Sequence, residues 1–178
     1  MKTRFRTSTR LPSLSGWLLG LTFLLISSEA LALKDLQGNE KRFEQLLGQG
    51  RWTVFEVWSS QCPACPDAVF YMNELKERGY AKAELIGISV DGDYGADGTR
   101  LTRDFLAQHP TNYPNLFSSS VEMDNFLFHY GAEFYGTPTV LIFDPQGKLS
   151  GIEVGALIAQ DIIDFIEARE TKTAVSAE

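Results

Sequence analysis

Hydrophobic and polar residues alternate along this chain in patterns that predict strands and helices in turn. Residues 53–58, 83–90 and 140–143 are apolar and rich in β-branched side chains, which is typical of buried strands. Between the first two runs, apolar residues recur at i, i+3 and i+6 from Val69, which predicts a helix. A strand, a helix and a second strand in this order predict a right-handed βαβ unit at the centre of the fold.

Weaker patterns predict the remaining elements. Amphipathic spacing predicts helices over residues 43–47, 99–108, 121–130 and 158–168. An extended lead-in or short strand is predicted over residues 33–40, and further strands over 113–117 and 149–154. The run 113–117 contains a proline, so we expect it at the edge of the sheet. Residues 91–98 predict a solvated loop, because the ligand spacing and terminal Glu of an EF-hand are absent, and residues 171–178 predict a frayed polar tail.

The first 32 residues are typical of a secretory signal peptide. Four basic residues precede an apolar run of 11 residues at 16–26, and the small residues Ala30 and Ala32 fit a signal peptidase site. We therefore expect cleavage after Ala32 and export to the periplasm. The apolar run is shorter than the ~20 residues that span a bilayer. An uncleaved anchor in the inner membrane stays open if residues 11–14 extend the run.

Length and charge limit the possible functions. Without the leader 146 residues remain, enough for one domain with a single core, which we place at residues 33–170. The leader holds four basic residues and one acid, so the remainder carries 12 basic and 22 acidic side chains and a net charge of −10. Such a surface argues against binding to nucleic acid or to anionic lipid. We expect a monomer.

The chain has only two cysteines, Cys62 and Cys65, which lie where a predicted strand gives way to a predicted helix. A helix N-terminus favours negative charge and lowers the pKa of a cysteine thiol from ~8.5 to as little as ~3.5 in such motifs. We expect Cys62 to be the more exposed nucleophile, and Cys65, one turn into the helix, to attack a mixed disulfide formed at Cys62. A single pair in an exported protein also indicates catalytic use. The pattern therefore predicts dithiol–disulfide exchange.

Other uses of the two cysteines have weaker support. A structural zinc site needs two more ligands, but the chain has no further cysteine, and its two histidines, His109 and His129, stand apart. We expect both histidines at the surface and no metal. Pro63 and Pro66 indicate a turn rather than a core strand, and a disulfide across so short a loop would stabilise the fold little.

The predicted order β-α-β-α-β-α-β-β-α, with a CxxC at a strand–helix junction and Thr137-Pro138 before a late strand, resembles the thioredoxin superfamily. Within it the chain looks most like the TlpA-like exported thioredoxins. It shares with them an Asp-Leu-x-Gly lead-in at residues 35–38, a Thr-Pro-Thr-x-x-x-x-Asp-x-x-Gly run at residues 137–147, and an added helix–strand segment before the Thr-Pro. The resemblance spans residues 33–169. It implies an α/β thioredoxin fold whose central mixed β-sheet is flanked by helices.

The resemblance implies roles for the cysteines and for the Thr-Pro pair. Cys62 matches the nucleophile and Cys65 the resolving cysteine of the family. Pro138 matches its cis-proline, and Thr137 and Pro138 would touch the substrate. No cofactor is implied beyond the redox-active Cys62–Cys65 disulfide.

Trp58 also matches the family, which has a tryptophan four positions before the first cysteine. The residues around the pair that we expect to face the substrate are Trp58, Gln61, Pro63 and Ala64. Glu56, six positions before Cys62, falls where thioredoxins keep a buried acid. Desolvation would raise its pKa, and it would accept a proton from Cys65. The alternative for Glu56 is a strand carboxylate that faces solvent or pairs with a lysine.

Three positions depart from the family's usual pattern. Gln61 stands where a tryptophan is usual, which changes the surface beside the cysteines. Pro66 lies inside the first helical turn, where its ring would crowd the Cys62 carbonyl and loosen or kink the start of the helix. Phe70 stands where thioredoxin itself has a proline. These departures bear on the redox potential rather than on the fold.

The resemblance implies a reductant of protein disulfides that takes electrons from a membrane thiol-transfer protein, with apocytochrome c as a candidate substrate. The opposite direction, disulfide oxidation or isomerisation, stays open, although Pro63-Ala64 lacks the histidine of strong oxidants. A copper chaperone of the same fold also stays open, since two thiolates suit Cu(I). Such proteins, however, space their cysteines by three residues and add a late histidine. A peroxidase is disfavoured, because no Thr-x-x-Cys pattern precedes the pair.

Overall fold

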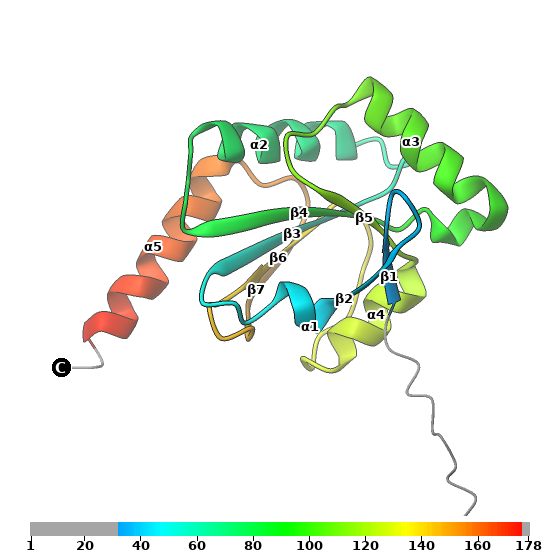
Figure 1. The fold of residues 1–178 in the computed structure, drawn as a ribbon. Helices are drawn as coiled ribbons and strands as arrows, with labels where there is room; N and C mark the ends of the chain where they lie inside the picture. Colours follow the sequence, from blue (N-terminus) through cyan, green and yellow to red (C-terminus); the bar gives the residue numbers. More distant parts are fainter. Residues whose placement is uncertain (1–31, 176–178) are drawn as a thin grey trace, which may run out of the picture.

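The fold is organised around one seven-stranded sheet. The structure, a computed structural model, describes residues 32–175. Its strands lie in the order β2-β1-β5-β4-β3-β6-β7 (Figure 1). The strands are β1 (Ala32–Asp35), β2 (Glu40–Arg42), β3 (Trp52–Trp58), β4 (Ala83–Ser89), β5 (Asn115–Phe117), β6 (Thr139–Phe143) and β7 (Leu149–Val154). The α-helices are α1 (Phe43–Leu46), α2 (Cys65–Glu77), α3 (Gly98–Gln108), α4 (Ser120–Phe128) and α5 (Ala159–Val175).

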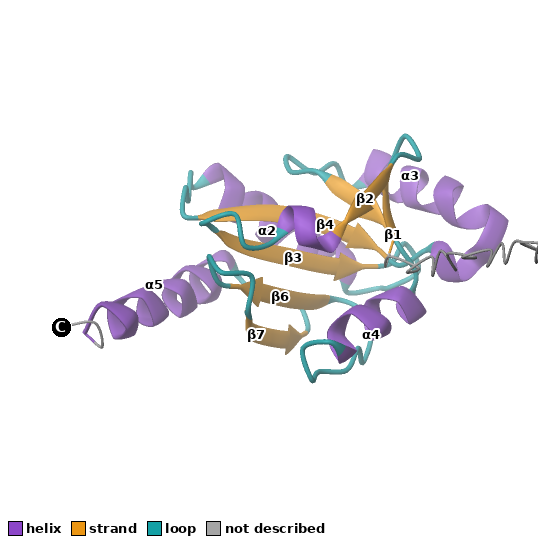
Figure 2. Ribbon diagram, turned by 60° about the horizontal axis from the view of Figure 1, so that its bottom comes forward, coloured by secondary structure: helices purple, strands orange, loops and turns teal. Residues whose placement is uncertain are grey.

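The sheet is mixed and covered by helices on both faces. β3, β4 and β5 run parallel to one another, whereas β6 pairs antiparallel with β3, and β7 with β6. Figure 2 shows β4, β3, β6 and β7 side by side. Buried side chains of α2, α3 and α5 cover one face, and those of α1 and α4 cover the other. The predicted α/β class, with a mixed central sheet flanked by helices, is confirmed.

β3 carries the site and is buried along its whole length, because helices cover both of its faces. Successive side chains of a strand point to opposite faces of the sheet. Phe55 packs with α1 and α4, whereas Val54 and Trp58 pack with the helices of the other face. Glu56 shares the face of Val54 and Trp58. A carboxyl group therefore lies inside the apolar layer that α2 covers.

The predicted position of residues 113–117 at the sheet edge is wrong. This run forms β5, which pairs with β1 on one side and with β4 on the other. Pro114 precedes the strand, so its missing N–H removes no bond of the ladder. Its carbonyl still accepts a hydrogen bond from the Gly87 N–H at 2.9 Å.

Two segments predicted as irregular are helical. Residues 91–98 contain a 3₁₀ helix, η1 (Gly92–Asp97), which packs closely enough that a Cβ at Gly92 would lie 2.4 Å from the Ser118 carbonyl oxygen. α5 continues to Val175, past its predicted end at residue 168. Glu170 holds this extension in place, because it accepts hydrogen bonds from the Trp52 indole and the Lys82 ammonium group.

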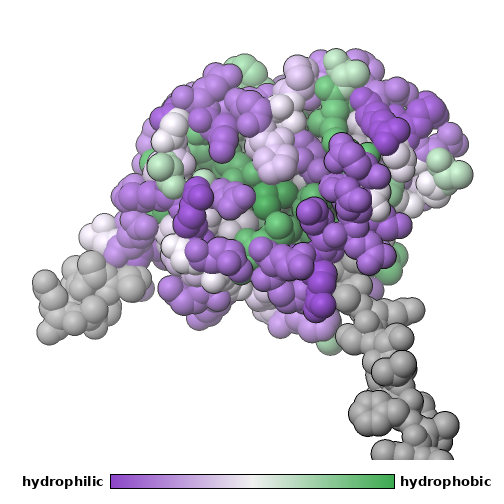
Figure 3. All heavy atoms as spheres, in the orientation of Figure 1, coloured by the Kyte–Doolittle hydropathy of each residue, from purple (hydrophilic) through white to green (hydrophobic). Residues whose placement is uncertain are grey.

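The predicted leader lies outside the described residues apart from Ala32, and its cleavage stays a prediction. The last three residues of the predicted tail also lie outside them. Between residues 32 and 175, no helix combines the length and the apolar character that crossing a membrane requires. Hydrophilic side chains cover most of the face shown in Figure 3, and hydrophobic side chains gather in a band across its centre.

Candidate active site

The two cysteines lie at the junction of β3 and α2. β3 ends at Trp58, and α2 begins at Cys65, with residues 59–64 forming the redox loop between them. The Cys62 N–H donates to the Ser59 carbonyl at 3.1 Å, and the Cys65 N–H donates to the Cys62 carbonyl at 3.2 Å. Cys62 is partly exposed, whereas Cys65 is fully buried. Of the two thiols, only Cys62 can meet a substrate.

Pro66 does not disturb the start of α2. It is the second residue of the helix, where an N–H would have no acceptor within the helix. The Cys62 carbonyl lies before the helix and accepts from the Cys65 N–H instead. The expected loosening of the helix start is therefore wrong.

The Thr-Pro loop lies against the cysteines. The Thr137–Pro138 peptide bond is cis, as the resemblance implied. The Cys62 thiol donates to the Thr137 carbonyl at an Sγ–O distance of 3.4 Å, across 75 residues of sequence. The Gly155 N–H, which follows β7, donates to the Pro138 carbonyl at 2.8 Å. The loop thus borders the nucleophile, and its contact with a substrate stays a prediction.

Burial governs the chemistry of Cys65. It raises the pKa of the Cys65 thiol above the ordinary value, and a hydrogen bond with Cys62 raises it further. Hydrogen bonds with Ser59 and Thr137 act in the opposite direction. Because the thiolate is the nucleophile, Cys65 needs a base before it can attack a disulfide.

Glu56 is a buried acid, with 1% of its surface exposed. Burial raises the pKa of its carboxyl group to about 7, against the opposing effect of a hydrogen bond from Tyr113. The Tyr113 hydroxyl donates to Oε2 at 2.5 Å, whereas Oε1 has no hydrogen-bond partner within the described part of the chain. The alternative of a solvent-facing or lysine-paired carboxylate is wrong for this position.

Trp58 packs in the buried cluster that also contains Cys65. It is fully buried, and its indole Nε1 donates to Asn115 Oδ1 at 3.1 Å. Its ring stacks on Phe105 of α3, with centroids 4.5 Å apart and planes 24° from parallel. The expected contact between Trp58 and a substrate is wrong, because no part of the side chain is exposed. The other loop residues expected to face a substrate are exposed, and their contacts stay predictions: Gln61, Pro63 and Ala64.

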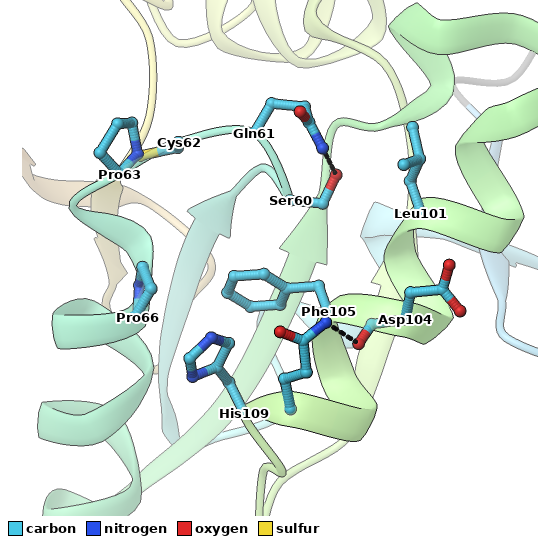
Figure 4. A pocket seen from close by; sticks show the side chains of 10 residues that line it. Ser60, Gln61, Cys62, Pro63, Pro66, Leu101, Asp104, Phe105 and His109 are labelled. Atoms are coloured by element: carbon cyan, nitrogen blue, oxygen red, sulfur yellow. Dashed lines mark hydrogen bonds between the residues drawn. The ribbon is translucent and has the colours of Figure 1, made fainter.

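A cavity of about 480 Å³ separates the redox loop and the first turn of α2 from α3 (Figure 4). Its lining includes Cys62 and Pro66 on one side and Phe105 and His109 on the other. His109 was expected at the surface but is half-buried, with its ring 4.8 Å from that of Phe105. His129 is exposed, as expected. The sequence predicts α3 as a helix, but it carries no signal that this helix borders the cysteines.

Asp91 is a second buried carboxylate near the redox loop. It accepts hydrogen bonds from Ser59 Oγ at 2.8 Å and the Ser60 N–H at 2.9 Å. It also accepts one from Thr102 Oγ1 of α3 at 2.9 Å. Asp91 therefore joins the redox loop to α3. The sequence placed this residue in a solvated loop and gave it no role, because its partners lie 11 to 32 residues away.

The ligand environment of the cysteines is sparse. Within residues 32–175, no three His, Cys, Asp or Glu side chains come together as candidate metal ligands. Neither histidine joins Cys62 and Cys65 in such a group. The copper-chaperone alternative therefore lacks its third ligand among these residues.

Comparison with known proteins agrees with this geometry. The family model described as "AhpC/TSA family" matches residues 28–152. The chain belongs to the AhpC/TSA family. The resemblance to the thioredoxin superfamily, drawn from the CxxC and the Thr-Pro, is confirmed.

Two curated relatives of this AhpC/TSA chain are disulfide-exchange proteins by name. It is 25% identical over 123 residues to the thiol:disulfide interchange protein DsbE of Vibrio cholerae, which covers 69% of this chain and 60% of the relative. It is 26% identical over 136 residues to the thiol-disulfide oxidoreductase ResA of Geobacillus thermodenitrificans, covering 76% of this chain and 72% of the relative. The match thus covers only part of each relative's length, 60% of DsbE and 72% of ResA.

Solved structures show the same fold. StoA of Bacillus subtilis superposes with a TM-score of 0.58 at 15% identity, covering 76% of this chain and 94% of StoA. The thioredoxin-related protein of Neisseria meningitidis serogroup B superposes with a TM-score of 0.63 at 17% identity, covering 78% and 98%. These similarities confirm the predicted thioredoxin fold.

Proposed function

We propose that this chain is an exported thiol–disulfide oxidoreductase of the TlpA-like kind, which reduces protein disulfides in the periplasm. The observation that carries the proposal is the pairing of a partly exposed Cys62 with a buried Cys65 beside the cis-proline loop. The names of the two curated relatives support it, since both denote disulfide exchange.

In the proposed reaction, the Cys62 thiolate attacks one sulfur of a substrate disulfide. A bond forms between Cys62 and that sulfur, and the other substrate sulfur leaves as a thiolate and takes up a proton. Glu56 then accepts the proton of Cys65, whose thiolate attacks the Cys62 sulfur. This step closes the Cys62–Cys65 disulfide and releases the second substrate thiolate. The substrate gains two electrons and the protein loses two.

The dipeptide between the cysteines supports the reducing direction. Pro63 and Ala64 offer no histidine to stabilise a Cys62 thiolate and make the protein a strong oxidant. A reductant must be re-reduced after each cycle, and we propose a membrane thiol-transfer protein as the electron donor. Thr137 and Pro138 would hold the substrate backbone, and apocytochrome c is a candidate substrate.

The reduction potential of the cysteine pair tests this function. The full chain is equilibrated in glutathione or dithiothreitol buffers, and free thiols are counted by alkylation and mass spectrometry. A value near ~−270 mV, as in thioredoxin, supports a reductant, whereas a value near ~−120 mV overturns the reducing direction. If Cys62 and Cys65 never form a disulfide, the exchange mechanism itself is wrong. Cys65→Ser is the control, because it should trap a mixed disulfide at Cys62.

A further inference from the structure

The hydrogen bond between Tyr113 and Glu56 joins the segment before β5 to the central strand, across 57 residues. Tyr113 is buried, with 6% of its surface exposed, and it belongs to the same apolar cluster as Val54 of β3 and Met72 of α2. Its hydroxyl engages Oε2 of Glu56, and Oε1 is left without a partner in the described part of the chain. Buried polar atoms in native proteins nearly always have a partner, so this oxygen requires an explanation.

Within the described part of the chain, no positive charge is buried with Glu56. Among the side chains that the structure describes, no lysine, arginine or histidine is buried. The cross-strand positions beside Glu56 hold Gly87 on β4 and an apolar residue on β6. On α2 the one buried titratable group is the Cys65 thiol, and the other buried carboxylate, Asp91, has its own donors at the redox loop. Tyr113 and Cys65 are therefore the buried titratable groups of this layer. The partly buried Tyr80 packs against the same cluster as Tyr113, but its hydroxyl donates to Glu167 of α5.

The space beside Glu56 on β4 is already filled. A Cβ at Gly87 would lie 2.1 Å from Asn115 Oδ1 and 3.0 Å from Trp58 Nε1. These two atoms form a hydrogen bond with each other. The Asn115 amide also donates to the Tyr113 carbonyl at 3.1 Å. β4 therefore cannot supply a side-chain partner for Glu56, and the partner comes from the segment that leads into β5.

This segment is fixed to the helix that carries Cys65. Asn73 of α2 donates to the Pro110 carbonyl at 2.9 Å and accepts from the Asn112 N–H at 2.9 Å. Two side-chain hydrogen bonds thus tie the backbone near Tyr113 to α2. The donor to Glu56 and the resolving thiol are held in one framework.

We propose that Tyr113 is a positioning residue for the proton transfer from Cys65 to Glu56. By donating to Oε2, its hydroxyl stabilises the ionised carboxylate and leaves Oε1 free to take the proton. A neutral donor suits this task, because a nearby cation would hold the carboxylate ionised and weaken it as a base. Burial and the neighbouring Glu56 raise the pKa of Tyr113, so the hydroxyl remains a donor and does not itself exchange the proton. This inference rests on the proposed function, in which Glu56 is the base.

Reaction with Ellman's reagent, an aromatic disulfide, separates the two chemical steps. In stopped flow, the reduced full chain releases one thionitrobenzoate when Cys62 attacks and a second when Cys65 resolves the mixed disulfide. Tyr113→Phe removes the hydroxyl and keeps the ring. Without the hydrogen bond from this hydroxyl, the pKa of Glu56 rises. We therefore expect the pH profile of the second phase to shift to higher pH by about one unit. The profile of the first phase is expected to stay in place.

Two further variants separate the inference from the function on which it rests. Tyr80→Phe is the matched control, because it also removes a tyrosine hydroxyl, one that donates to Glu167 Oε1 at 3.2 Å and not to Glu56. The pH profile of its second phase should equal that of the wild type. Glu56→Gln should slow the second phase and remove its titration near neutral pH. An unchanged second phase in Glu56→Gln would overturn the role of Glu56 as the base. A changed phase in Glu56→Gln with an unshifted profile in Tyr113→Phe would overturn the inference about Tyr113 alone.

A substitution that keeps the hydroxyl provides a second test in case Tyr113→Phe does not fold. Site-specific replacement of Tyr113 by 3-fluorotyrosine gives a more acidic phenol of nearly the same shape and thus a stronger donor. We expect the second phase to shift to lower pH, opposite to the effect of the phenylalanine. An unshifted profile with this residue contradicts the inference even if the phenylalanine variant does not fold.

Discussion

At the scale of single residues, the number of donors separates the two buried carboxylates. Asp91 accepts from two side chains and one backbone N–H, and these three hydrogen bonds anchor the redox loop. Among the described residues, Glu56 has one donor and one oxygen without a partner, which leaves it able to take up a proton. The sequence indicated an acid at Glu56, because a carboxylate inside an apolar strand is conspicuous. It could not indicate Tyr113 or Asp91, whose roles exist only through partners distant in sequence.

Replacing Asp91 tests its anchoring role. Asp91→Ala removes the acceptor of three hydrogen bonds, so we expect the free energy of unfolding to fall by about 3 kcal/mol. We also expect slower attack by Cys62, because Ser59 and Ser60 lose their anchor. Urea denaturation and the first phase with Ellman's reagent measure the two effects. The exposed Asp97, replaced by alanine, is the control and should change both little; an equal loss in the two variants would contradict the anchoring role.

At the scale of elements, local patterns predict which runs form strands and helices, but they do not predict placements that depend on long-range contacts. The runs that became β3, α2, β4 and β6 were predicted from hydrophobic spacing alone, since each is long or strongly apolar. The interior place of β5 was not predicted, because it depends on pairing with β1 from the other end of the chain. The role of α3 beside the cysteines was missed for the same reason. Its apolar residues identify a buried face but not the elements that this face contacts.

The contact between α3 and the site predicts the effect of Phe105→Ala. Removing the ring that stacks on Trp58 leaves a void next to the redox loop, and we expect the free energy of unfolding to fall by about 3 kcal/mol. The rate of the Cys62 attack should change as well, because Phe105 also lines the cavity that Cys62 borders. Phe128→Ala on α4 removes an equally large ring that is 78% exposed, so it should have little effect on either quantity. Chemical denaturation and stopped flow provide both readouts.

At the scale of the whole molecule, the buried acid links stability to pH. The pKa of Glu56 is about 7 in the folded chain against an ordinary 4.5. Between these values the folded chain holds a proton that the unfolded chain has lost. The free energy of unfolding therefore falls as pH rises through this window, by about 3 kcal/mol in total, and the loss is complete above the folded pKa.

Urea denaturation at pH 5 and pH 8 measures this linkage. The wild type should lose about 2.5 kcal/mol more than Glu56→Gln between the two pH values, because glutamine does not titrate. Both proteins also contain the same remaining ionisable groups, so the difference isolates Glu56. Equal losses would show that Glu56 does not carry the raised pKa.

The glycine beside Glu56 has a consequence for how this site can evolve. Because the Trp58–Asn115 hydrogen bond fills the space next to Gly87, no single substitution at position 87 can give the acid a new partner. A lineage that replaces the tyrosine donor with a side chain from β4 must first give up the asparagine, and it passes through an intermediate with an unsatisfied tryptophan. Positions 87, 113 and 115 should therefore change together among relatives. A lineage that has adopted one donor to the acid cannot exchange it by a single substitution.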